Sequence, residues 1–196
     1  MTKKLLLGLL LLLSLQAISQ DKNWSVEANY PILLGDDYLD EYNGLLDLGL
    51  NYRFVRLGVF EIGAGINGGI FQNKNGRNSN IIVDGKAFYI QPRVFTELHL
   101  RRFRPSFGIG YSIWNEDIEA DLIGDNFEPF DYNDTNGGLN INLGVSFDIT
   151  KHFFVKAQYD FTRLNIRDTI EQEGEAFDFE RNENVDIIKF GVGFRF

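Results

Sequence analysis

The chain has 196 residues, no cysteine and a formal net charge of −9. This length fits one domain, and the lack of cysteine excludes both a disulfide framework and a lipid-anchored cysteine. The acidic balance argues against nucleic-acid binding, which needs a positively charged face.

Residues 1–19 have the pattern of a secretory signal peptide. Lys3 and Lys4 form a basic start, an apolar run extends from Leu5 to Leu15, and small residues lead to a cleavage site after Ser19. The alternative is a membrane-spanning helix, but this apolar run reaches only about 16 Å, roughly half of a bilayer core. We therefore expect cleavage, which leaves 177 residues and a charge of −11 because both lysines are lost.

The rest of the chain shows a period-two pattern eight times. In each segment apolar residues alternate with Gly, Asn or charged residues, which gives a strand one apolar face and one polar face. The segments are Trp24–Tyr30, Leu46–Phe54, Phe60–Ile66, Phe88–Leu100, Phe107–Ile113, Leu139–Ile149, Phe153–Phe161 and Ile188–Phe196. No comparable stretch has the 3.6-residue period of an amphipathic helix, so the sequence predicts an all-β fold.

The links between these segments alternate between short and long. The short links are 55–58, 101–104 and 150–151, and the long ones are 32–43, 71–86, 115–137 and 165–185. Transmembrane β-barrels have this asymmetry, with tight periplasmic turns and longer outer loops. Pro92 lies within a segment and cannot donate a ladder hydrogen bond, so we expect a β-bulge near Gln91.

The direction of the apolar face decides between a membrane barrel and a soluble lipocalin-like barrel, because both have one apolar face. The polar face is rich in glycine, which suits a narrow interior better than a water-facing strand. Its acids and bases number six and five, close to the balance that buried ion pairs require. We therefore expect a charge network inside the lumen, made of Glu27, Asp47, Arg53, Glu61, Arg93, Glu97, Asp148, Lys156, Asp160, Lys189 and Arg195. Arg101, Arg102 and Arg104 are expected on a short turn, which gives a basic periplasmic rim.

These features resemble the OmpA-like small outer-membrane β-barrels, and the residue composition is similar to that of Bacteroidetes members. The resemblance covers Asp21 to Phe196 and implies one domain, 20–196, that forms an eight-stranded antiparallel up-and-down transmembrane β-barrel in the cell outer membrane. It implies contact with outer-membrane lipids and lipopolysaccharide, and favours a monomer. It also implies a barrel-insertion signal, read by the barrel-assembly machinery, that consists of Phe190, Val192, Phe194 and Phe196.

Other motifs give no catalytic, cofactor or metal site. The run from Gly63 to Gly68 matches a dinucleotide fingerprint, but the helix that this site requires does not follow it. His99 and His152 suggest a lipid-modifying barrel enzyme, yet no serine lies at a suggestive spacing. We therefore expect a protein that is not an enzyme and that has no cofactor.

The long links 115–137 and 165–185 are rich in acids. They do not match the spacing of a calcium loop, so we expect a solvated surface, with weak binding of divalent cations as the alternative. Thr169, in Asp168-Thr169-Ile170, matches a short O-glycosylation motif.

The preferred function is a structural, surface-displaying outer-membrane scaffold with a packed, salt-bridged lumen. A narrow porin-like channel for small solutes is the first alternative, and a soluble periplasmic lipocalin-like carrier is the second.

Overall fold

The computed structural model describes residues 23–34, 42–73, 77–78, 81–122, 130–172 and 175–196. The expected signal peptide lies outside these residues. Within them, no helix is long and apolar enough to cross a membrane. The strands are β1 (Trp24–Leu34), β2 (Tyr42–Leu57), β3 (Phe60–Asn73), β4 (Arg77–Asn78), β5 (Ile81–Leu98), β6 (Phe103–Leu122), β7 (Phe130–Asp148), β8 (Phe153–Gln172) and β9 (Glu175–Arg195).

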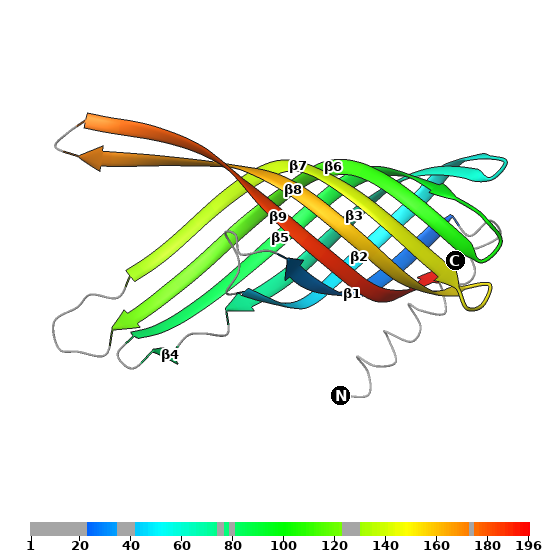
Figure 1. Cartoon of the computed structure of the whole chain (residues 1–196), viewed down its shortest axis with the longest axis horizontal. Helices are drawn as coiled ribbons and strands as arrows, with labels where there is room; N and C mark the ends of the chain where they lie inside the picture. The colour runs from blue at the N-terminus through cyan, green and yellow to red at the C-terminus, as the bar shows by residue number, and fades with distance from the viewer. Residues whose placement is uncertain (1–22, 35–41, 74–76, 79–80, 123–129, 173–174) are drawn as a thin grey trace, which may run out of the picture.

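Eight long strands close into one antiparallel barrel, and the two-residue β4 pairs only with β5 in the described part of the chain (Figure 1). The long strands follow one another around the wall, because each pairs with the next long strand in the chain. The first and last strands complete the ring, with pairs from Ser25↔Arg195 to Leu34↔Asp186. Trp24 and Phe196 also exchange two backbone hydrogen bonds of 3.0 and 3.1 Å. The predicted eight-stranded up-and-down barrel is confirmed.

The apolar face of each strand points outward. Alternate residues of β1 are exposed and buried, and exposed residues such as Val26 and Ile32 are apolar, whereas the buried Glu27 and Asn29 are polar. The same arrangement continues around the wall, where large apolar side chains remain exposed on every long strand. In a lipocalin-like carrier the apolar face would line the interior, so this orientation is opposite to the one that the carrier alternative requires.

The short turns lie at one end of the barrel, together with the C-terminus (Figure 1). Gly58 and Val59 join β2 to β3, and Arg101 and Arg102 lie between the bridged residues Leu100 and Phe103. The prediction that Arg104 lies on this turn is wrong, because β6 already begins at Phe103 and the Arg104 side chain is buried inside the barrel. The reason is the tightness of the turn, which needs only two residues.

The long links are largely strands and not loops, which corrects the expectation. β6 and β7 stay paired out to Ala120↔Phe130, and β8 and β9 stay paired out to Gln172↔Glu175. The β7–β8 pairing, however, stops at Gly137↔Asn165. Beyond this point the wall splits. β6 stays paired with β5 out to Ile81↔Leu122, whereas the β8–β9 hairpin, which pairs with β1 only as far as Asp186, projects alone and far from the short-turn end (Figure 1). Thr169 lies in this hairpin, opposite Asp178.

Pro92 does not produce the expected bulge. The β5–β6 ladder has the same register at Ile90↔Ile113 and at Arg93↔Gly110, on either side of the proline. The proline is therefore accommodated by a local gap in the ladder without an extra residue. Bulges occur instead in β2, one of them between Gly44 and Leu46, where Leu45 and Leu46 both face outward.

Two inward-facing aromatic rings of β5 lie over glycines of β3. Phe95 is paired with Gly63, and Tyr89 is paired with Gly69. A Cβ atom added to either glycine would overlap the ring of its partner. Glycine is therefore required at both positions by this close approach.

Candidate functional site

The lumen holds the residues that sequence patterning singled out. All eleven predicted charge-network residues lie on inward-facing positions, and most of them are almost fully buried. They form three polar clusters along the barrel axis, and an apolar layer follows toward the hairpin end. Each cluster draws side chains from several strands, because inward positions at the same height meet across a narrow barrel.

The rim cluster lies nearest the short turns and consists of Arg53, Glu61, Glu97, Arg104, Asp148 and Arg195. Arg53 binds Glu97 through Nη2 at 3.1 Å and lies 3.4 Å from Glu61. Arg195 pairs with Asp148, and its guanidinium carbon lies 3.8 Å from the centre of the Phe154 ring. Since each carboxylate faces at least one guanidinium, the desolvation penalty of this buried cluster is offset by ion pairing.

Arg104 is the member of the rim cluster that the sequence prediction missed. Its Nη1 lies 3.2 Å from Glu61 and 3.0 Å from Glu97, and its Nε donates to Asp148 at 2.9 Å. With Arg104 included, the three clusters contain six acids and six bases. The signal was available in the sequence, because Arg104 has the same inward parity as Gly108 and Ser112 on the same strand.

The middle cluster consists of Glu27, Asn51, Arg93, Lys156 and Gln158. Lys156 Nζ lies 2.7 Å from Glu27, and the Asn51 amide donates to the other Glu27 oxygen at 2.8 Å. Arg93 donates to Gln158 at 3.2 Å and to Asn51 at 3.1 Å. This cluster borders a cavity of about 10 Å³, which is room for about one water molecule.

The central lysine cluster consists of Lys189, Asp47, Asp160, Gln91 and Tyr89, from four strands. Lys189 is 1% exposed, and its Nζ lies 2.7 Å from Asp160, 3.0 Å from Asp47 and 3.1 Å from the Gln91 oxygen. The Tyr89 ring centre lies 4.7 Å from the same nitrogen. Three partners and an aromatic face surround this ammonium group, so it is fixed at the barrel axis.

Asp47 is the hydrogen-bond acceptor at the centre of the same cluster. It accepts from Asn29 at 2.6 Å and from Asn67 at 2.9 Å, as well as from the Tyr89 hydroxyl and Lys189. Four donors satisfy both of its oxygens, which compensates for the complete burial of the carboxylate.

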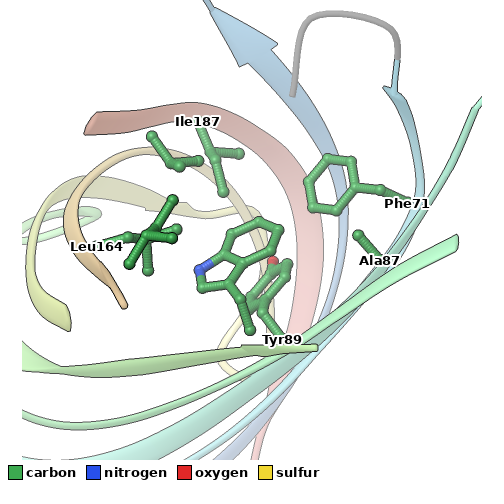
Figure 2. Packing of buried hydrophobic residues seen from close by; sticks show 8 residues of the cluster. Phe71, Ala87, Tyr89, Leu164 and Ile187 are labelled. Carbon is green, nitrogen blue, oxygen red and sulfur yellow. The ribbon is translucent and has the colours of Figure 1, made fainter. Parts of the chain in front are cut away.

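An apolar layer lies in the lumen on the hairpin side of the central lysine cluster. It consists of Phe71, Ala87, Tyr89, Trp114, Leu164, Ile166, Val185 and Ile187. Trp114 stacks on Tyr89 with ring centres 4.7 Å apart and on Phe71 at 5.6 Å. Figure 2 shows the side chains of Phe71, Tyr89, Leu164 and Ile187 gathered inside the barrel. Sequence patterning missed this layer, because Phe71, Ile166 and Val185 fall within links that the pattern predicts to be loops.

The two histidines lie at the short-turn end, where His99 contacts the rim cluster through Arg104 and His152 lies outside the three clusters. His99 is exposed, with Nε2 3.3 Å from Arg104, and His152 stacks on Phe194 at 5.5 Å. Among the described residues, no group of three or more His, Cys, Asp or Glu side chains is placed to hold a metal ion. The Gly63–Gly68 run lies in β3, whose odd-numbered residues face the lumen.

The four residues of the expected insertion signal lie on the last strand and at the C-terminus. Phe190 and Val192 face outward, and Phe194 is half-buried. Phe196 is buried, and its ring centre lies 6.4 Å from that of Phe194. The backbone of the terminal residue pairs with Trp24, so Phe196 lies at the seam between β1 and β9.

Comparison with known proteins identifies the family. A family model described as the outer membrane protein beta-barrel domain matches residues 5–196. No curated protein matches the sequence.

Several solved structures share the fold. A major outer membrane protein from Thermus thermophilus aligns with a TM-score of 0.63 and 12% identity, over 88% of this chain and 98% of that one. Neisserial surface protein A gives a TM-score of 0.58 and 16% identity, over 89% and 97% of the two chains. Ail of Yersinia pestis gives 0.55 and 14%, over 88% and 96%. Identities this low show a shared fold alone, whereas the family match spans nearly the whole sequence. The chain therefore belongs to the outer membrane protein β-barrel domain family.

Proposed function

We propose that this protein is a structural outer-membrane barrel, a packed scaffold that holds two acid-rich hairpins outside the membrane. The observation that carries the proposal is the pair of layers across the lumen, the central lysine cluster and the apolar layer beside it. Together they place a fixed ion pair and stacked aromatic rings across the axis.

The lumen favours a scaffold over a channel. A conducting pore needs continuous water and usually an excess of one charge along its wall. Here the three clusters are balanced in charge, and the cavity beside the middle cluster has room for about one water molecule. The apolar layer adds a second barrier, because an ion that enters it would lose its hydration without gaining a polar partner.

The hairpins are the part of the molecule that a scaffold would display. The stretch 115–137 carries eight acids and no base, and 165–185 carries seven acids and two bases. Ail, which shares the fold, has been crystallised with a heparin analogue, sucrose octasulfate. A polyanion of that kind would be repelled by these acidic hairpins, so we propose cationic surfaces or bridging divalent cations as partners here.

The remaining proposals concern assembly. We propose that the chain inserts through the barrel-assembly machinery by means of its last strand, and that it works as a monomer among outer-membrane lipids and lipopolysaccharide. The exposed apolar side chains around the wall and the buried Phe196 at the seam support this proposal.

Conductance measurements in planar bilayers test the scaffold against the channel. The wild-type protein is expected to give no sustained current. The double variant Lys189→Ala/Trp114→Ala removes the central side chain of the central lysine cluster and of the apolar layer, and it is expected to conduct. Ile90→Ala on the outward face of β5 is the control that should remain silent. Steady large currents from the wild type, together with solute entry into liposomes, would establish the channel instead.

A further inference from the structure

A basic pocket lies at the short-turn end of the barrel, between the β5–β6 turn and the β7–β8 turn. It has a volume of about 400 Å³ and is lined by His99, Arg101, Arg102, Arg104 and Lys151, with Asp148 as its carboxylate. The pocket thus gathers four cationic side chains and a histidine around one acid.

Asp148, the single acid of this pocket, does not neutralise the cationic side chains at the outer part of the pocket. Asp148 is already bound by Arg104 at 2.9 Å and by Arg195, both of which belong to the rim cluster. Arg101 and Arg102 are exposed, and no carboxylate of the described residues forms an ion pair with either of them. The mouth of the pocket is therefore positively charged.

The backbone conformation of Arg101 indicates that the turn itself does not require an arginine at this position. Arg101 has a φ of 59°, in the left-handed region that favours glycine. The β2–β3 turn has the same two-residue length and places Gly58, with a φ of 63°, at the same position. An arginine in place of glycine strains the turn, and such outliers concentrate at binding sites.

Apolar surface adjoins the pocket on the lipid-facing side. Leu100 and Phe103, which flank the turn, are 50% and 56% exposed. An outward-facing apolar groove of about 430 Å³ begins at Phe103 and Phe147, whose ring centres lie 5.0 Å apart. Phe103 directly follows Arg102, and Phe147 directly precedes Asp148, so the groove and the pocket meet at one strand pair.

We propose that this pocket binds the phosphate of an anionic phospholipid, whose acyl chain lies along the apolar groove. Guanidinium groups bind phosphate oxygens in pairs of parallel hydrogen bonds, which matches the two adjacent arginines. A ligand with both an anionic head and a hydrocarbon tail uses both surfaces, whereas a free anion uses only the pocket. The site depends on insertion in a membrane and is independent of whether the lumen conducts.

Lipid retention measured by native mass spectrometry tests the site. The full mature protein is folded in vesicles with equal amounts of phosphatidylglycerol and phosphatidylcholine of the same acyl chains, and is then extracted in mild detergent. We expect phosphatidylglycerol to be retained over phosphatidylcholine. The double variant Arg101→Gly/Arg102→Gln should weaken this preference by about 25-fold, because each cation near an anionic lipid surface contributes roughly five-fold.

The variant is designed to keep the fold. Arg101→Gly matches the residue at the equivalent turn and relieves the strained φ, so heat-modifiability on a gel should remain as in the wild type. Lys86→Gln/Arg163→Gln removes two exposed charges from other strands and should leave the preference unchanged. Equal retention of both lipids by the wild type, or an equal loss in the control variant, would overturn the proposal. A free anion would be the ligand if two results were found together: millimolar inorganic phosphate displaces the lipid, and phosphate saturates the same arginines in a titration without vesicles. That outcome would reject the lipid proposal.

Discussion

Replacing Lys189 by methionine is the sharpest test of the packed lumen. The substitution keeps the length of the side chain but removes the only ammonium group that contacts both Asp47 and Asp160 within the described residues. Both carboxylates are completely buried. Loss of one partner from a buried ion pair costs about 3–5 kcal/mol, because the remaining charge is desolvated and uncompensated.

The structure places the Lys189→Met effect toward the lower end of this range and identifies its source. Asp47 keeps three donors, from Asn29, Asn67 and Tyr89, so it remains partly compensated. Asp160 depends more strongly on Lys189, since it otherwise accepts from the Gln158 amide at 2.5 Å. We therefore expect Lys189→Met to lower the free energy of unfolding by about 3 kcal/mol. The double variant Lys189→Met/Asp160→Asn should recover about 1–2 kcal/mol of this loss, as expected for two coupled residues.

Urea unfolding in lipid vesicles, followed by tryptophan fluorescence, measures both Lys189 variants. Trp114 is a local reporter, because it stacks on Tyr89, whose ring in turn contacts Lys189. A loss below about 1 kcal/mol for Lys189→Met, which is the size of an ordinary substitution, would refute the reasoning. So would a double variant that is less stable than the single one.

Three further predictions concern the other layers and the C-terminus. Trp114→Ala should cost about 3–5 kcal/mol in unfolding free energy and should increase water access to the lumen, measured by hydrogen exchange of the neighbouring strands. Arg104→Gln should lower the free energy of unfolding by about 3 kcal/mol in the same urea assay, because it leaves buried carboxylates without their ion-pair partner. Arg102→Gln on the adjacent turn should change the free energy of unfolding by no more than about 0.5 kcal/mol. Phe196→Ala should reduce the amount of folded protein in the outer-membrane fraction of cells more than Phe190→Ala does. The reason is that Phe196 is buried at the seam, whereas Phe190 is exposed. Equal levels of the two variants would contradict a special role of the last residue.

The barrel could be predicted from the sequence because period-two alternation is a local property. Each of the eight segments falls within a long strand or at its immediate end, and the inward parity of residues such as Glu27 and Lys189 follows directly from the pattern. The position of both chain ends on the short-turn side also follows from the even number of strands, whereas the pairing of β1 with β9 follows from the expectation of a membrane barrel.

The upper part of the lumen could not be predicted in the same way. At the level of Trp114 several inward residues, such as Phe71, Ile166 and Val185, are apolar, whereas Glu116 and Asn136 remain polar. The contrast between the two faces is therefore inconsistent, and alternation no longer marks the strand. The acidic, Gly- and Asn-rich composition of 115–137 and 165–185 is also typical of loops, although cross-strand pairing keeps most of these residues in hairpins. Arg104 was misplaced for a different reason, because the length of the turn depends on the backbone conformation of Arg101, which arginine rarely adopts.

The two aromatic–glycine pairs between β3 and β5 have a consequence for the dimensions of the barrel. Phe95 and Tyr89 are six residues apart, and so are Gly63 and Gly69. If β5 slid by two residues in one direction, Tyr89 would face Phe71, and in the other direction Phe95 would face Glu61. Only the observed alignment gives both rings a glycine. Strand offset around a closed sheet sets its shear number, and the shear number together with the strand number sets the radius and the tilt. These two contacts therefore help to decide how wide the cylinder is before any side chain fills it.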